Sequence, residues 1–215
     1  IMETQMETQM ETQMETPIIY LLRGRSGSGK DTVASILRER FGYVRYAFAD
    51  ILKQIVAEKY DANIALFHTQ EGKKEICPKT GKTWRQMLIE EGANERKKDP
   101  YVYVKKLVEN IQKEPLCNRS RIVITDWRYP NELEYIENSS LAGTYFIRKL
   151  HIISPNRSVY FDDPSEHALD YRVDDPILIN GNTIEELQGV ILEMSVDFMA
   201  LLWPYYGLIM ALLWP

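Results

Sequence analysis

The chain has 215 residues, of which 45% are hydrophobic and 27% charged, and its formal net charge at pH 7 is −5. These values are typical of a globular enzyme with one sizeable core, and the acidic balance argues against a general nucleic-acid-binding protein. The two cysteines, Cys77 and Cys117, are too few for a disulfide framework and have no metal-ligand spacing. We therefore expect free thiols in a reducing compartment, which favours a cytoplasmic protein.

The two ends differ in composition from the middle of the chain. Residues 1–17 are dominated by a Met-Glu-Thr-Gln repeat without apolar periodicity, so we expect a disordered tail and no signal peptide. Residues 199–215 form an apolar tail that contains Met-Ala-Leu-Leu-Trp-Pro twice. This tail is too short for a membrane span and is interrupted by Pro204 and Gly207. We expect it to pack on the domain or to lack a function, with a homodimer contact or a membrane-surface contact as alternatives.

Residues 18–198 alternate segments typical of strands with segments typical of helices. Strands are predicted at 18–22, 43–48, 121–126, 145–153 and 176–179. Helices are predicted to begin at residue 33, after an N-cap at Asp50, at Pro130 and after a cap at Thr183. Two further helices are predicted over 83–94 and 100–113. Residues 61–82 and 154–170 are polar, and we expect irregular structure there. This alternation favours an α/β domain, a mainly parallel five-stranded sheet between two layers of helices, with ligands at the carboxyl ends of the strands.

A glycine-rich segment, Gly24-Arg-Ser-Gly-Ser-Gly-Lys-Asp-Thr32, joins the first predicted strand to the first predicted helix. Strand, glycine loop and helix is the context that a phosphate-binding loop requires. Glycines let backbone amides turn inward, the helix N-terminus adds partial positive charge, and Lys30 can reach the β- and γ-phosphates of a nucleotide. The pattern G-x-x-x-x-G-K-[ST] is matched except at Asp31, which stands where Ser or Thr is usual, with Thr32 one place later.

A second candidate segment follows the predicted core strand at 121–126. Asp126 ends this strand, a usual place for a residue that holds Mg²⁺ through water or orients a phosphoryl acceptor. Arg128 lies two residues further on and could bind a phosphate with its forked guanidinium. The alternative is a helix-capping Asp and a solvated Arg.

Several blocks, in matching order, resemble the phage and large-virus deoxynucleoside monophosphate kinases, a branch of the P-loop nucleoside monophosphate kinases. In that family the loop reads Ser-Gly-Lys-Asp-Thr, as it does at 28–32, so Asp31 is an expected feature of the resemblance. The other blocks are Phe48-Ala-Asp-Ile-Leu-Lys53, Thr83-Trp-Arg-Gln-Met-Leu88, Asp99-Pro-Tyr-Val-Tyr-Val-Lys105, Ile124-Thr-Asp-Trp-Arg-Tyr-Pro-Asn-Glu132, Ser165-Glu166, Ile179-Asn-Gly181 and Ile184-Glu-Glu-Leu187.

The resemblance implies a three-layer P-loop kinase fold, with substrate-side helices at about 50–113 and a lid loop at about 154–170. It implies transfer of the γ-phosphoryl of ATP, with Mg²⁺, to a deoxynucleoside 5′-monophosphate, which would supply DNA precursors in the cytoplasm, that of the host if the chain is viral. The implied catalytic residues are Lys30, Asp31, Asp126 and Arg128, and Asp31 and Asp126 are the candidate Mg²⁺ ligands. The implied ATP-binding residues are Gly24, Gly27, Ser28, Gly29, Lys30, Asp31, Thr32 and the lid candidate Arg157. The implied acceptor-binding residues are Lys53, Arg85, Tyr103, Arg128, Glu132 and Glu166.

Each acceptor residue has a chemical reason and a simpler alternative. Lys53 and Arg85 would hold the acceptor phosphate, but either could be a solvated helix charge. Tyr103 would stack on the acceptor base, or it could be part of the core. Glu132 and Glu166 would accept hydrogen bonds from base or sugar, or could be surface carboxylates. For the whole chain, the alternatives are another P-loop small-molecule kinase similar to dephospho-coenzyme A kinase, and a non-catalytic nucleotide-binding module.

Overall fold

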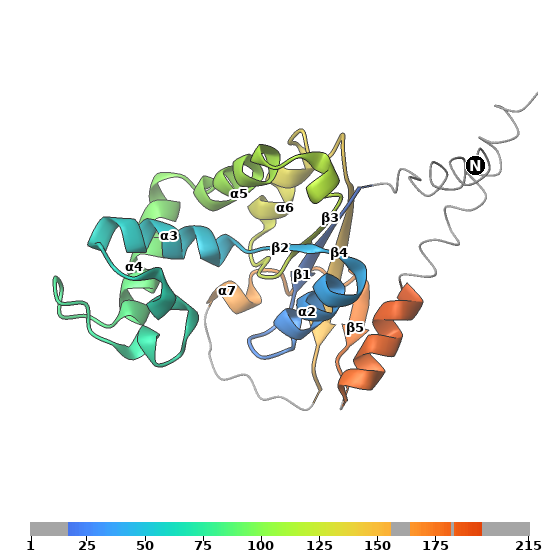
Figure 1. Cartoon of the computed structure of the whole chain (residues 1–215), viewed down its shortest axis with the longest axis horizontal. Coiled ribbons are helices and arrows are strands. Elements are labelled where there is room, and N and C mark those ends of the chain that lie inside the picture. Colours follow the sequence, from blue (N-terminus) through green and yellow to red (C-terminus); the bar gives the residue numbers. More distant parts are fainter. Residues whose placement is uncertain (1–16, 156–163, 182, 195–215) are drawn as a thin grey trace, which may run out of the picture.

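Five parallel strands form the centre of the protein in a computed structural model (Figure 1). The structure describes residues 17–155, 164–181 and 183–194, apart from the side chains of Pro164 and Glu166. The strand order is β2-β3-β1-β4-β5, and every pair of neighbours is parallel. The strands are β1 Ile18–Arg23, β2 Val44–Tyr46, β3 Arg121–Ile124, β4 Phe146–Ile153 and β5 Ile177–Ile179. The predicted α/β fold with a five-stranded sheet is confirmed.

Helices connect these strands and cover both faces of the sheet (Figure 1). The α-helices are α2 Lys30–Phe41, α3 Phe48–Tyr60, α4 Trp84–Lys98, α5 Val102–Lys113, α6 Pro130–Glu137, α7 Pro164–His167 and a last helix at 184–194. The short 3₁₀ helices are η1 Ile64–His68, η2 Gly72–Lys74 and η3 Leu116–Asn118. The predicted cap at Thr183 is confirmed, since its Oγ1 accepts a hydrogen bond from the amide of Glu186 at 3.1 Å.

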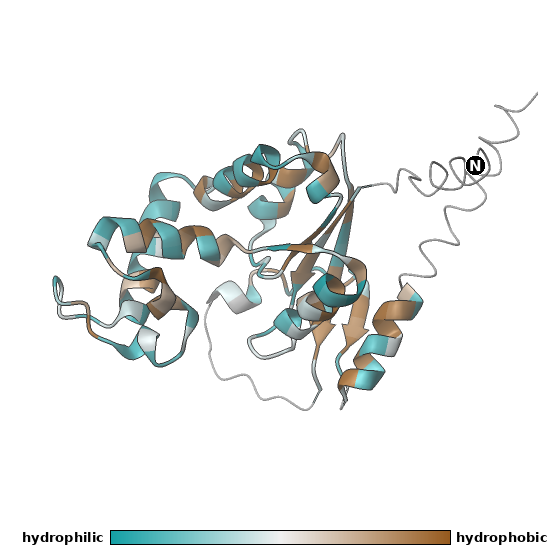
Figure 2. Cartoon of the chain, viewed as in Figure 1, coloured by the Kyte–Doolittle hydropathy of each residue, from teal (hydrophilic) through white to brown (hydrophobic). Residues whose placement is uncertain are grey.

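The three layers follow from the alternation of side chains along β1. Ile19 and Leu21 point to the face that α3, α5 and α6 cover. Ile18 and Leu22 point to the opposite face, where α2 and the 184–194 helix pack. Because side chains alternate along a strand, one apolar run serves both cores. Figure 2 shows the result, with hydrophobic strands between helices whose outer surfaces are hydrophilic.

A smaller core lies beyond the edge of the sheet, among α3, α4 and η1. Phe67, Cys77 and Trp84 are each at most 4% exposed, and they pack with Val56 and Met87. The polar stretch 61–82, predicted to be irregular, therefore contains two short 3₁₀ helices and an antiparallel bridge between residues 76 and 83. Most of its apolar residues fall in two short groups, 64–67 and 76–77, which are too short to show a period, so the local pattern did not reveal this packing.

The start of α3 differs from its prediction. Asp50 is not the N-cap: the helix begins at Phe48, Ala47 is its N-cap, and Asp50 lies in the first turn. The carboxylate that satisfies the first amides belongs to Asp126, from the segment after β3. A cap from a distant strand has no local sequence signal, which is why the helix start was misplaced.

The two terminal tails, with the repeats of both, lie outside the described residues. Among the described helices, none combines the length and the apolar composition that crossing a membrane requires.

Candidate active site

The glycine loop between β1 and α2 requires glycine at two of its positions. Gly24 and Gly29 have φ values of 144° and 99°, in the region that side chains disfavour. A Cβ added at Gly24 would lie 2.2 Å from the carbonyl oxygen of Ile152, and one at Gly29 would lie 2.2 Å from Nδ2 of Asn180. The loop is therefore folded tightly against the ends of β4 and β5, which fixes the direction of its backbone amides.

The amides at the start of α2 are suited to an anion. Gly29 is the N-cap of this helix, and no side chain caps its first turn. Lys30 Nζ donates to the carbonyl oxygens of Gly24 at 2.6 Å and Arg25 at 2.9 Å, so the ammonium lies across the loop. Ser28 Oγ is buried and has no hydrogen-bond partner within the described part of the chain. Uncapped amides, a lysine ammonium and an unpaired buried hydroxyl make a set of donors that fits a polyphosphate.

Asn180 supports this loop from the far edge of the sheet. Its side-chain amide donates to the carbonyl oxygen of Ser28 at 2.9 Å, and its backbone amide donates to Ile153 at 2.7 Å. Asn180 thus links the end of β5 to the glycine loop. In the sequence its segment only resembled a family block, and nothing local marked this contact.

Asp126 joins β3 to the substrate-side helices. Its Oδ1 accepts from the Phe48 amide at 2.8 Å and its Oδ2 accepts from the Ala49 amide at 2.7 Å. Burial raises the pKa of Asp126, whereas these two amides act in the opposite direction. The helix-capping alternative is therefore realised, although on a helix distant in sequence. Asp126 holds the start of α3, and each of its oxygens retains a lone pair for a metal-bound water.

Arg128 lines a cleft that lies between the glycine loop and α7. Arg128 Nη1 donates to Ser165 Oγ at 2.8 Å, so this arginine is not simply solvated. Arg25, in the glycine loop, lies against His167 and Asp170, with its Nη2 2.7 Å from Asp170 Oδ2. The lining of the cleft comes from the end of β1, the glycine loop, the segment after β3, β4, and α7 with the turn after it. It comprises Arg23, Gly24, Arg25, Trp127, Arg128, His151, Ser165, Leu169 and Asp170.

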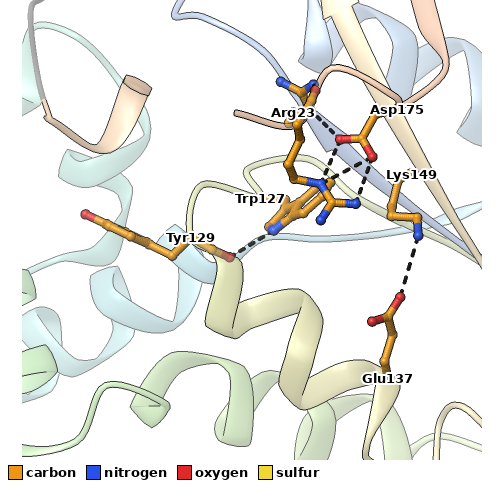
Figure 3. Close-up of polar contacts among 7 residues, drawn as sticks. Arg23, Trp127, Tyr129, Glu137, Lys149 and Asp175 are labelled. Carbon is orange, nitrogen blue, oxygen red and sulfur yellow. Dashed lines mark hydrogen bonds and ion pairs between the residues drawn. The ribbon is translucent and has the colours of Figure 1, made fainter. Parts of the chain in front are cut away.

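The floor of this cleft is a buried ion pair that the sequence did not reveal. Arg23 Nε lies 2.7 Å from Asp175 Oδ2, and both side chains are about 5% exposed. Figure 3 shows this pair beside the indole of Trp127, whose Nε1 donates to the carbonyl oxygen of Tyr129 at 2.9 Å. Arg172 also contacts Asp175 and stacks on Trp127 at 5.1 Å. The hydrogen bonds compensate for burial of these charges and fix the segment that leads into β5.

Lys53, in α3, and Arg85, in α4, are two further cations among the predicted site residues. The side chain of Lys53 is only 13% exposed, and its ammonium lies 2.6 Å from Asp50. Arg45 also binds Asp50 at 2.6 Å, and together these cations lower the pKa of Asp50 although burial acts to raise it. Arg85 Nη2 donates to Gln70 Oε1 at 2.5 Å. Neither residue is a fully solvated helix charge.

Lys73 is a further cation in this region that sequence reasoning missed. Burial lowers its pKa, and Lys53 and Arg85 lower it further, while Asp31 and Asp50 act to raise it. These five groups, from α2, α3, η2 and α4, thus lie within electrostatic range of one another. We refer to Lys53, Lys73 and Arg85 as the cation cluster.

Tyr103 is a core residue. Its ring is 2% exposed and is covered by the guanidinium of Arg96, whose Cζ lies 4.7 Å from the ring centroid and equally far from that of Tyr129. Burial raises the pKa of Tyr103 to about 12, and its hydroxyl has no hydrogen-bond partner within the described chain. The ring is therefore not an exposed stacking surface, and Arg96 is the planar group beside it.

Glu132 is buried at the N-terminus of α6. Its Oε2 accepts from the amides of Arg128 at 2.9 Å and Tyr129 at 3.0 Å. Burial raises the pKa of Glu132 to about 7, and nearby Asp126 acts in the same direction. The surface-carboxylate alternative is therefore wrong for Glu132, which is 3% exposed.

The remaining candidates divide into two groups. Asp31 and Thr32 are exposed in the first turn of α2, directly after Lys30. Arg157 and the side chain of Glu166 lie outside the described residues.

The described residues include no cluster of three or more metal-binding side chains. A Mg²⁺ ion bound together with substrate phosphates needs only one or two protein carboxylates, and Asp31 and Asp126 are the predicted ones.

We predict that Glu132→Gln changes how stability depends on pH. The pKa of Glu132 is 4.5 in the unfolded chain and about 7 in the folded protein, so the folded protein binds this proton more tightly. Protonation of Glu132 therefore stabilises the fold. This stabilisation is fully present below pH 4.5 and is lost as pH rises through about 7. Urea unfolding at about pH 5 and about pH 8 should show wild type losing stability relative to Glu132→Gln, by at most a few kcal/mol. The exposed carboxylate Glu134, changed to Gln, is the control. An equal difference between wild type and Glu132→Gln at both pH values would contradict the prediction.

Comparisons with known proteins agree with this geometry. A family model described as phosphomevalonate kinase matches residues 22–142. A curated protein of Acanthamoeba polyphaga mimivirus, named putative deoxynucleotide monophosphate kinase, is 29% identical over 189 residues, covering 80% of this chain and 93% of that protein.

Solved structures give more distant matches. TT1252 from Thermus thermophilus is 21% identical with a TM-score of 0.46, covering 85% of this chain and 98% of that one. Dephospho-CoA kinase from Campylobacter jejuni is 14% identical with a TM-score of 0.45, covering 83% of this chain and 96% of that one.

The family model matches more than half of the chain, including the glycine loop and the segment with Asp126 and Arg128. The protein is therefore a phosphotransferase that belongs to the phosphomevalonate kinase family.

Proposed function

We propose that the protein transfers the γ-phosphoryl group of ATP to the 5′-phosphate of a deoxynucleoside monophosphate. The observation that carries the proposal is that Lys53 and Arg85 lie within electrostatic range of Lys73, as does Asp31 in the first turn of α2. The glycine loop ends at the same turn. Donors for a nucleotide polyphosphate and cations for a second phosphate thus flank one helix terminus.

The chemistry of the reaction explains this arrangement. An oxygen of the acceptor phosphate attacks the γ-phosphorus, the bond from that phosphorus to the β,γ-bridging oxygen breaks, and ADP leaves with the electron pair. The acceptor oxygen of a phosphate dianion is already ionised, so no general base is needed. The difficulty is electrostatic, because two anions must meet, and phosphoryl transfer is catalysed chiefly by positioning and charge stabilisation.

On the donor side, the glycine loop would bind ATP. The backbone of Gly24, Gly27, Ser28 and Gly29, with the Lys30 ammonium and Thr32, would surround the phosphates. Lys30 would exchange its two loop carbonyls for phosphate oxygens. Asp31 and Asp126 would hold Mg²⁺, which supplies charge neutralisation between the phosphates when bound. Arg128, beside Arg25 in the cleft, would contact the transferred group, and Arg157 would approach from the lid.

On the acceptor side, Lys53 and Arg85 would bind the monophosphate. Asp126 contributes indirectly, because its hydrogen bonds to the first amides of α3 position the helix that carries Lys53. Glu166 would contact the base or sugar, whereas the buried Glu132 would act indirectly, by fixing the backbone of Arg128 and Tyr129. Tyr103 would take part through the guanidinium of Arg96 stacked on its ring. Because this guanidinium lies over two aromatic rings, its N–H groups rather than its faces would contact a nucleobase, by donating hydrogen bonds to the base.

Two features favour a nucleotide over phosphomevalonate as the acceptor. The mimivirus relative named as a deoxynucleotide monophosphate kinase aligns over 93% of its own length, whereas the family model ends at residue 142. The second feature is the cluster of planar side chains formed by Tyr103, Arg96 and Tyr129. In this proposal the protein supplies DNA precursors, in the cytoplasm of a host if the chain is viral.

The first test is an ADP-release assay with ATP and a panel of acceptors. We expect turnover with at least one of the four deoxynucleoside monophosphates, and loss of turnover in Lys30→Ala. The panel also contains the ribonucleoside monophosphates, phosphomevalonate and dephospho-coenzyme A. Turnover with one of the last two acceptors and with no nucleotide would contradict the proposal. ATP binding without transfer to any acceptor would indicate a non-catalytic module.

The second test separates the acceptor side from the donor side. We expect Arg85→Ala to raise the KM for the deoxynucleoside monophosphate by roughly 10- to 100-fold, the usual loss for a charge-assisted hydrogen bond. The KM for ATP should change little. Arg38→Ala, on the exposed surface of α2, serves as the control. A rise confined to the KM for ATP would show that Arg85 does not bind the acceptor.

A further inference from the structure

We infer that Lys73, in the short helix η2, is a third cation that binds the phosphate of the acceptor, together with Lys53 and Arg85. This inference rests on the proposed function and deepens it. No block of the family resemblance contains Lys73, and it lies in a stretch whose sequence predicted irregular structure.

The position of Lys73 is fixed by packing. Gly72 is buried, and a Cβ there would lie 2.4 Å from the carbonyl oxygen of Leu66, so η2 packs closely on η1. The amide of Gly72 donates to Thr69 Oγ1 at 2.9 Å. Arg85 reaches Gln70, in the same turn, from α4. The stretch that carries Lys73 is therefore held by the smaller core rather than lying loosely on the surface.

Four cations, Lys73, Lys53, Arg85 and Arg45, share two carboxylates, Asp31 and Asp50, so positive charge is in excess around Lys73. Its ammonium is partly buried and makes no hydrogen bond or ion pair within the described chain. Lys53 and Arg85 repel it, while Asp50, one of the two nearby carboxylates, is already bound by Arg45 and Lys53. Burial and this repulsion lower the pKa of Lys73. Gathering like charges costs free energy unless an anion compensates, and a phosphate dianion would do so.

The neighbouring lysine supplies a matched control. Lys74 lies in the same turn of η2 but is exposed. Removing either side chain changes the net charge equally. A general effect of charge on substrate attraction would therefore affect both variants, whereas a direct contact with phosphate would affect Lys73 alone.

The experiment compares Lys73→Ala, Lys73→Arg and Lys74→Ala in steady-state assays with ATP and a deoxynucleoside monophosphate. We expect Lys73→Ala to raise the KM for the acceptor by at least about tenfold and to leave the KM for ATP within about twofold. Lys73→Arg should recover most of this loss, and Lys74→Ala should match wild type. Thermal unfolding of each variant shows whether it is folded.

Two results would overturn the inference: equal acceptor KM values for Lys73→Ala and Lys74→Ala, or a rise in the KM for ATP as large as that for the acceptor. If wild type uses phosphomevalonate instead of a nucleotide, the proposed substrate is wrong, and the same comparison of variants with phosphomevalonate as the acceptor still tests Lys73.

If wild type transfers to no acceptor, equilibrium dialysis measures the binding of thymidine 5′-monophosphate to each variant and tests the role of Lys73. Weaker binding by Lys73→Ala than by Lys74→Ala supports the inference, and equal or absent binding overturns it.

Discussion

In the proposed reaction, repulsion between two phosphate-bearing substrates is the constraint on which the rest of the site depends. A protein with a net charge of −5 can bring two such anions together only where it concentrates cations locally. It does so at the first turn of α2, with Lys30 on the glycine loop and the cation cluster beyond it. The parallel sheet makes this possible because the carboxyl ends of its strands deliver their loops to one edge.

Carboxylates in this site act mainly as structural partners of the cations and amides. Asp126 caps α3, Asp50 binds Lys53, and Asp175 binds Arg23 beneath the cleft. Each of these pairs joins elements or side chains that must hold a fixed geometry near the loop. The proposed transfer between phosphates needs no general base, so in this proposal the carboxylates would serve the reaction by placing cations rather than by moving protons.

Local patterns in the sequence predicted the fold and the glycine loop, because both depend on short-range features. Strands of alternating or continuous apolar residues, and glycines before a helix, can be recognised within about ten residues. Features that depend on distant partners could not be predicted. Asp50 resembled an N-cap, but the capping carboxylate is Asp126; Lys73 stood in a polar stretch with no pattern; and the Arg23–Asp175 pair joins residues 152 positions apart.

The most direct test of the central claim is a crystal structure with a bisubstrate analogue in which adenosine and thymidine are joined by five phosphates. The account predicts that the phosphates nearest adenosine contact the amides of the glycine loop and Lys30, while the phosphate nearest thymidine contacts Lys53 and Arg85. A structure in which the thymidine end leaves the loop in another direction, away from Lys53 and Arg85, would contradict it.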